Sequence, residues 1–108
     1  MNPFSPQQFL RELFNNAVNV VSAEKCLPDF LPLPPRGKTL VIGAGKAAAA
    51  MAKVVEENWT GELSGLVVTR YGHGANCKKI AVVEAAHPVP DEAGHKAATR
   101  ILDFFRNL

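Results

Sequence analysis

The side chain best placed for chemistry is Lys46, which follows Gly43 and Gly45 in the run Gly-Ala-Gly-Lys-Ala-Ala at residues 43–48. An apolar segment precedes this run and an alanine-rich segment follows it, so the pattern predicts a strand, a glycine loop and a helix N-terminus. Glycine lets the backbone approach a ligand closely, and the N–H groups of the first helical turn point outward. With the helix dipole and the lysine ammonium group, they predict a site for an anion such as phosphate.

The same run partly matches the dinucleotide-binding pattern Gly-x-Gly-x-x-Gly/Ala, with Ala48 in the last place. It is not a Walker A loop, because the pattern Gly-x-x-x-x-Gly-Lys-Ser/Thr is absent. The alternative interpretation is a tight strand-to-helix turn that binds no ligand.

A second loop carries Arg70 and the triplet Gly72, His73 and Gly74, directly after the apolar residues 65–69. The guanidinium group of Arg70 suits the extra phosphate of NADP or a substrate carboxylate. The two glycines free the backbone to curve around a ligand or to present N–H groups to an anion. The alternative is a solvated strand end followed by a plain turn.

A third loop follows the apolar residues 80–85 and contains His87 between two alanines and two prolines. The prolines stiffen the loop, which would hold His87 or Asp91 beside a ligand. For Asp91 we favour a different role, because aspartate is a natural helix N-cap.

The spacing of the other chemically active side chains excludes several kinds of site. His73, His87 and His95 lack metal-ligand spacing, so we expect no metal site. Cys26 and Cys77 form no Cys-x-x-Cys pair, which favours a reduced, cytoplasmic protein, although a single disulfide stays open. No Ser-His-Asp or Cys-His arrangement is present.

Residues 1–26 are predicted to form a leading helix, which is strongest over 5–24. Ser5 suits the N-cap position, and Gln8 would complete a capping box. An apolar stripe follows helical spacing and consists of Phe9, Leu10, Leu13, Phe14, Ala17, Val18 and Val21. Residues 27–37 hold four of the eight prolines and are predicted to be an extended connector.

Residues 38–108 are expected to form an α/β core with strands at 39–42, 65–69 and 80–85 and helices at 45–59 and from Asp91 onward. The residues expected to be buried on these two helices are Ala48, Met51, Ala52 and Val55, then Ala97, Ala98, Ile101, Leu102 and Phe105.

The element order α-β-α-β-β-α predicts a three-layer, Rossmann-like α/β domain with a mostly parallel sheet. The connection between the second and third strands is short for a helical crossover, so the third strand is antiparallel or an edge strand. If the strands are parallel, all three loops leave at their carboxyl ends, where ligands bind in such sheets. We expect an incomplete fold that stops inside a helix; the alternative is a small domain that oligomerises to cover its open edge.

The composition excludes several classes of function. The 108 residues are 47% hydrophobic with a formal charge of +2, too small a charge to indicate binding to nucleic acid or to a membrane surface. No apolar run approaches the roughly 20 residues that a membrane span needs. The N-terminal residues have neither the basic segment nor the apolar segment of a signal peptide.

Residues 41–48, 67–74 and 84–91 together resemble the N-terminal part of the class II glycerate kinases, a family also labelled hydroxypyruvate reductase. Nearly the whole chain takes part in the resemblance, although family members are several times longer and Ala86 stands where we expect a glycine. The resemblance implies transfer of phosphate from ATP to the 2-hydroxyl of D-glycerate with Mg²⁺. It also implies that Lys46 is catalytic and that Arg70 and the 72–74 loop line the cleft.

Two other functions stay open. An NADPH-dependent hydroxypyruvate reductase fits the glycine loop and Arg70. A non-catalytic phosphate-binding or self-associating module is the second alternative. We favour the kinase, and we expect the 108-residue chain alone to be inactive because half of the cleft would be missing.

Overall fold

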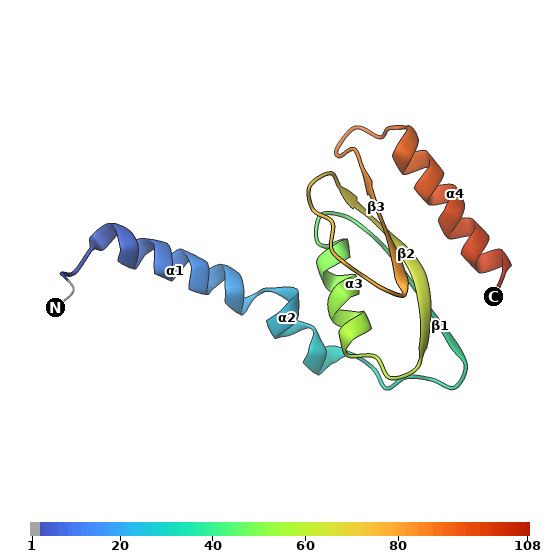
Figure 1. The fold of residues 1–108 in the computed structure, drawn as a ribbon, viewed down its shortest axis with the longest axis horizontal. Helices are drawn as coiled ribbons and strands as arrows, with labels where there is room; N and C mark the ends of the chain where they lie inside the picture. Colours follow the sequence, from blue (N-terminus) through green and yellow to red (C-terminus); the bar gives the residue numbers. More distant parts are fainter. Residues whose placement is uncertain (1–2) are drawn as a thin grey trace.

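A computed structural model describes residues 3–108 and contains a sheet of three parallel strands between helices (Figure 1). The strands lie in the order β1 (Lys38–Ala44), β2 (Glu62–Arg70) and β3 (Ile80–Ala85). Helix α3 (Ala48–Glu57) covers one face of the sheet and helix α4 (Glu92–Arg106) covers the other. The predicted three-layer α/β fold is confirmed, and so is the predicted order of strands and helices over residues 38–108.

Strand β3 is parallel to β2 and forms one edge of the sheet. The predicted edge position is confirmed, and the antiparallel alternative is wrong. The connection at residues 71–79 contains no helix and returns along the sheet as an extended loop. At its start, the backbone N–H of Gly72 donates to Oε1 of Glu84 at 2.7 Å. A side chain of β3 therefore holds the loop that leads into β3.

The end of this loop is held by Glu56 on α3, whose carboxylate accepts the backbone N–H groups of Lys78 (2.9 Å) and Lys79. Burial by itself raises the pKa of Glu56, but these N–H donors outweigh it and the pKa is lowered. The thiol of Cys77 lies beside this carboxylate, and burial together with the charge of Glu56 raises its pKa to about 11. Cys77 and Cys26 are both free, so the disulfide that the sequence left open is not formed.

The main core lies between α3 and the sheet. Its buried residues are Ala48, Ala52, Leu63, Val67 and Ile80. Small alanine side chains let the helix approach the sheet closely, as the sequence predicted for α3. Val55 packs against this core as predicted, whereas Met51 is 45% exposed, so its predicted burial is wrong. It lies on a flank of α3 that no strand covers.

Helix α4 buries a narrower face than the sequence predicted. Ala97 is buried and Ile101 is half-buried, as predicted, but Ala98, Leu102 and Phe105 are exposed. The helix packs on β2 and β3, and β3 is the last strand of the sheet, so strands cover only one flank of its apolar sector. The other flank remains open.

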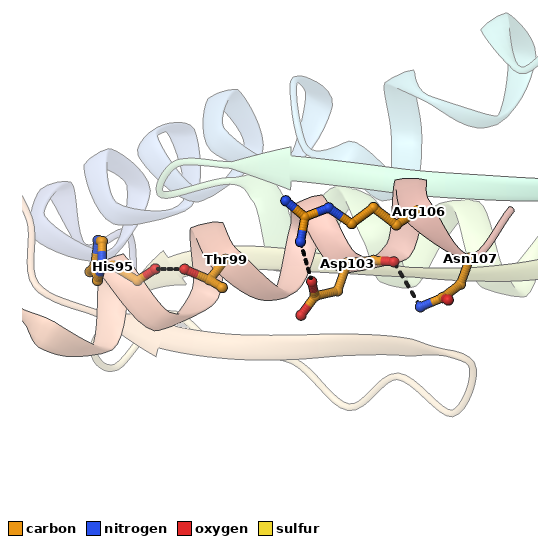
Figure 2. A network of polar contacts seen from close by, with 5 residues as sticks. All are labelled: His95, Thr99, Asp103, Arg106 and Asn107. Carbon is orange, nitrogen blue, oxygen red and sulfur yellow. Dashed lines mark hydrogen bonds and ion pairs between the residues drawn. The ribbon is translucent and has the colours of Figure 1, made fainter.

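Both ends of α4 are well defined. The carboxylate of Asp91 accepts the N–H of Gly94 at 3.0 Å, which confirms the predicted N-cap. At the other end, the side chain of Asn107 donates to the carbonyl of Asp103 at 2.9 Å, and Arg106 pairs with the Asp103 carboxylate at 3.4 Å (Figure 2). The helix ends at Arg106, and Asn107 takes the C-cap position.

The leading segment forms two helices, α1 (Pro6–Val20) and α2 (Ala23–Cys26), instead of the single predicted helix. The break follows β-branched Val20 and Val21, and Ser22 favours the start of a new helix. The connector begins with a short 3-10 helix, η1 (Pro28–Phe30), before it becomes extended. In Figure 1, α1 extends away from the sheet.

The predicted capping box of α1 is only half formed. Ser5 accepts the backbone N–H of Gln8 at 3.3 Å, as predicted for an N-cap. The side chain of Gln8, however, donates to Glu12 at 3.2 Å and does not return to the N-cap. One turn farther along the helix, Glu12 therefore competes for the glutamine amide.

Two backbones approach closely at Gly65 in β2. Its φ is +148°, and a Cβ at this position would lie 1.9 Å from the carbonyl oxygen of Val41 in β1. Only glycine fits here without a shift of the backbone. Sequence reasoning did not single out this residue, although a glycine inside a strand is the usual signal of such an approach.

We therefore expect Gly65→Ala to lower the free energy of unfolding by more than about 2 kcal/mol, because both the dihedral angle and the contact oppose a Cβ. Gly94→Ala is the matched control, since a Cβ in α4 would make only ordinary contacts at 3.6–3.7 Å. The control should leave stability equal or raise it by about 0.5–1 kcal/mol. Urea unfolding measures both, and equal midpoints for the two variants would contradict the account.

Candidate functional site

A cavity of about 290 Å³ lies at the edge of the sheet where the strands end. The loops that follow β1, β2 and β3 all line it, through Gly45, Lys46, Arg70 and His87 among others. Because the three strands are parallel, their carboxyl ends meet at this edge. Each of the three loops therefore contributes at least one predicted site residue to this cavity.

The remaining predicted residues lie elsewhere. Gly72 and Gly74 line a separate, open cavity of about 650 Å³ together with Lys53 and Glu84, and His73 lines neither cavity. The predicted 72–74 triplet is therefore not part of the wall around Lys46. Its backbone N–H at Gly72 is already paired with Glu84.

The glycine loop is shorter than predicted because β1 continues to Ala44. Gly43 lies inside the strand, where a Cβ would come within 3.1 Å of Val67 Cγ1, so its small size serves packing. Gly45 forms the turn itself, with φ of +127°, and its N–H donates to the carbonyl of Val68 at 3.0 Å. Of the two predicted glycines, only Gly45 lies at the cavity.

Helix α3 begins at Ala48, three residues later than predicted, because residues 45–47 form a turn. No side chain caps its N-terminus, and its first turn contains no acidic residue. The buried Thr69 hydroxyl donates to the carbonyl of Lys46 at 3.4 Å and so ties the turn to β2. The N–H groups of the first turn of α3 have no side-chain acceptor and follow Lys46 closely along the chain, an arrangement that favours a bound anion.

Asp91 joins the loops after β2 and β3. One carboxylate oxygen accepts the hydroxyl of Tyr71 at 2.7 Å, and the other accepts the N–H groups of Ala86 at 3.2 Å and Gly94 at 3.0 Å. The segment that carries His87 is therefore held at both ends. Sequence reasoning identified the helix cap but missed Tyr71, because the two partners are 20 residues apart.

This contact shifts two pKa values in opposite directions. The hydrogen bond from Tyr71, followed by that from Gly94, lowers the pKa of Asp91 below its ordinary value of 3.8. The same hydrogen bond raises the pKa of Tyr71 above 10.0. A carboxylate with a lowered pKa stabilises the folded state above its unfolded pKa, and that stabilisation is lost as the pH falls through the folded pKa.

We therefore expect the chain to lose stability below about pH 4, and Asp91→Asn to reduce that loss. Asparagine still caps a helix, so the variant removes the charge and keeps an acceptor. The measurement is the free energy of unfolding in urea at pH 7 and pH 3. Glu56 also has a lowered pKa, so part of the acid sensitivity will remain. If the free energy of unfolding falls by the same amount from pH 7 to pH 3 in Asp91→Asn as in the parent chain, Asp91 has no such role.

Within residues 3–108, no three His, Cys, Asp or Glu side chains lie close enough together to hold a metal ion. Of the helices in the described part of the chain, none has both the length and the hydropathy of a transmembrane segment.

Comparison with protein families gives one match over nearly the whole chain. The sequence model of the family described as "Domain of unknown function (DUF4147)" matches residues 9–108. The chain belongs to this family.

Its relatives carry two kinds of name. A protein of Agrobacterium vitis with the provisional name hydroxypyruvate reductase is 48% identical over 108 residues, which are 99% of this chain and 25% of that protein. The glycerate 2-kinase of Pyrococcus horikoshii is 43% identical over 82% of this chain and 20% of its own length. The D-glycerate 2-kinase of Thermotoga maritima is 30% identical over 99% of this chain and 26% of its own length.

Solved structures agree with this assignment. The crystal structure of a glycerate kinase from Thermotoga maritima superposes with a TM-score of 0.71 at 30% identity, over 94% of this chain and 25% of that one. A second crystal structure, of a protein from Pyrococcus horikoshii, gives a TM-score of 0.66 at 30% identity, over 95% of this chain and 27% of that one. The resemblance to the class II glycerate kinases is confirmed, and the chain spans about a quarter of the length of these relatives.

Proposed function

We propose that this chain forms the anion-binding wall of the active site of an ATP-dependent glycerate 2-kinase. The observation that carries the proposal is the meeting of Lys46, Arg70 and His87 around one cavity, beside the uncapped N-terminus of α3. Two cationic side chains, with the uncapped first turn of α3 directly after Lys46 along the chain, suit a phosphoryl group and a carboxylate. The names of the kinase relatives support the same reaction.

The size of the cavity limits what this wall holds. Pockets for small ligands usually have about 300–1,000 Å³, and this cavity of about 290 Å³ lies at the lower end. It suits the transferred phosphoryl group or a small hydroxy acid such as D-glycerate. The base and ribose of ATP would lie against other parts of the family fold.

In this proposal, the ammonium group of Lys46 stabilises the negative charge on the phosphoryl group during its transfer. Arg70 binds the carboxylate of D-glycerate with two parallel hydrogen bonds. His87 donates a hydrogen bond to the substrate from the opposite loop. The bond between the γ-phosphorus and the β–γ bridging oxygen then breaks, ADP leaves with that oxygen, and the phosphorus bonds to the 2-hydroxyl oxygen, whose proton passes to solvent.

The residues around this cavity do not fit the Mg²⁺ ion that the family implies. Mg²⁺ prefers oxygen ligands, above all carboxylates, and no Asp or Glu of the described chain lines the cavity. Asp91 lies next to it but already accepts three hydrogen bonds. We therefore assign no step to a metal held by this chain.

An NADPH-dependent hydroxypyruvate reductase is the second candidate. Arg70 lies at the end of β2, the place where Rossmann-like folds bind the extra phosphate of NADP. The name of the Agrobacterium vitis relative supports it as well. We favour the kinase because Gly43, the first glycine of the dinucleotide pattern, lies inside β1 and not in the loop.

The test uses a full-length family protein in which these 108 residues replace the matched segment. With ATP and D-glycerate it should form 2-phosphoglycerate, and Lys46→Ala should lower kcat/KM by about 100-fold or more. Lys38→Ala is the matched control, because Lys38 lies at the start of β1, away from the strand ends that line the cavity. Its kcat/KM should stay within twofold of the parent value.

Three results would contradict the proposal. Equal kcat/KM for Lys46→Ala and the parent would remove Lys46 from the reaction. Oxidation of NADPH by hydroxypyruvate without turnover of ATP would favour the reductase. A protein that binds phosphate and catalyses neither reaction would favour the non-catalytic module.

A further inference from the structure

The apolar stripe of α1 is largely uncovered in the described chain, where Phe9 contacts the ring of Phe4 with the ring centroids 5.7 Å apart. Its large side chains are between 48% and 73% exposed, and they are Phe9, Leu10, Leu13, Phe14, Val18 and Val21. Their positions follow the helical period, so that they lie on one face of α1 and of its C-cap residue Val21. The opposite face carries Gln8, Glu12, Asn15 and Asn19. The helix is strongly amphipathic, yet none of its residues is buried.

Such a helix needs a surface to pack on. An isolated helix of about 15 residues is marginal in water, and most helical stability in proteins comes from packing of the apolar face. In this structure α1 packs mainly against α2 and otherwise extends away from the sheet (Figure 1). The stripe is therefore not part of the core of this chain.

The overall dimensions support the same conclusion. The chain exposes 8099 Å² of surface, whereas a compact protein of 11.6 kDa exposes about 5,800 Å². Its radius of gyration is 17.5 Å, against about 13 Å for a compact domain of this length. The excess surface is larger than the roughly 800 Å² that each partner buries in a standard protein interface.

The occupant follows from where the exposed apolar side chains lie. Besides the α1 stripe, they include Phe30 and Leu33 in the connector and Leu102 and Phe105 on α4, which is at the opposite end of the molecule (Figure 1). A twofold pair of identical chains buries one shared patch on each copy and would leave the others in water. The family relatives match the α1 region and are about four times as long, so they contain enough polypeptide to cover several surfaces.

We propose that the α1 stripe is the docking surface for the remainder of the family fold, the polypeptide that corresponds to the part of the relatives that this chain does not match. The apolar side chains of α1 are buried against that part. This proposal does not depend on the chemistry of the cavity, because no stripe residue lines it.

Thiol labelling tests the proposal with matched variants, in a background where Cys26 and Cys77 are replaced. Leu13→Cys reports on the stripe, and Asn15→Cys reports on the polar face of the same helix turn. In the 108-residue chain, a maleimide should label both at rates within threefold. In the full-length Agrobacterium vitis relative that carries this chain in place of its matched segment, Leu13→Cys should be labelled at least tenfold more slowly and Asn15→Cys at an unchanged rate.

Equal labelling at both positions in the full-length protein would overturn the proposal. If that chimera does not fold, the same measurement on the Thermotoga maritima glycerate kinase, at the residues that superpose on Leu13 and Asn15, decides the question. Sedimentation of the 108-residue chain is the second measurement. A monomer agrees with the proposal, whereas a dimer that protects Leu13→Cys would assign the stripe to a second copy and overturn it.

Discussion

The candidate site depends on the parallel alignment of β3 with β2. This alignment places the end of β3 next to the ends of β1 and β2, so that Lys46, Arg70 and His87 line one cavity. A strand of six residues is about 20 Å long. If β3 ran the other way, His87 would lie about that far from Lys46, at the opposite edge of the sheet. The three loops share one site only because β3 runs in the same direction as β1 and β2.

Carboxylates hold this arrangement at three points where the backbone changes direction. Glu84 binds the start of the loop between β2 and β3, and Glu56 binds its end. Asp91 then joins Tyr71 to the start of α4. Each carboxylate accepts backbone N–H groups that the strands and helices leave unpaired. The loops are thus fixed by hydrogen bonds to neighbouring elements, and the cavity does not need a ligand to be defined.

The sequence was sufficient for most of the local structure. The pattern of apolar residues predicted β3 at its observed bounds, and aspartate before an amphipathic segment predicted the Asp91 cap. The direction of β3 stayed open because its connection has no helix and is held by Glu56, a residue about 20 positions away. The same limit applies to Tyr71, whose partner Asp91 is distant along the chain. Periodicity describes contacts within one element and says little about such pairs.

Two predictions were wrong because they depended on how far the sheet extends. Gly43 was predicted in the loop, but pairing with Val67 extends β1 beyond it. Leu102 and Phe105 were predicted to be buried, yet the sheet ends at β3 and leaves that flank of α4 uncovered. Their apolar character is explained if the family fold, about four times longer, continues over this flank as it does over α1.

The central claim is that three loops form one anion site in this chain, and an NMR titration with inorganic phosphate tests it most directly. The account predicts that the backbone amides from Gly45 to Ala49 shift together with those of Arg70 and His87, along one binding curve with a single Kd. Shifts that spread over unrelated surface lysines, or that leave Arg70 and His87 unchanged, would contradict it.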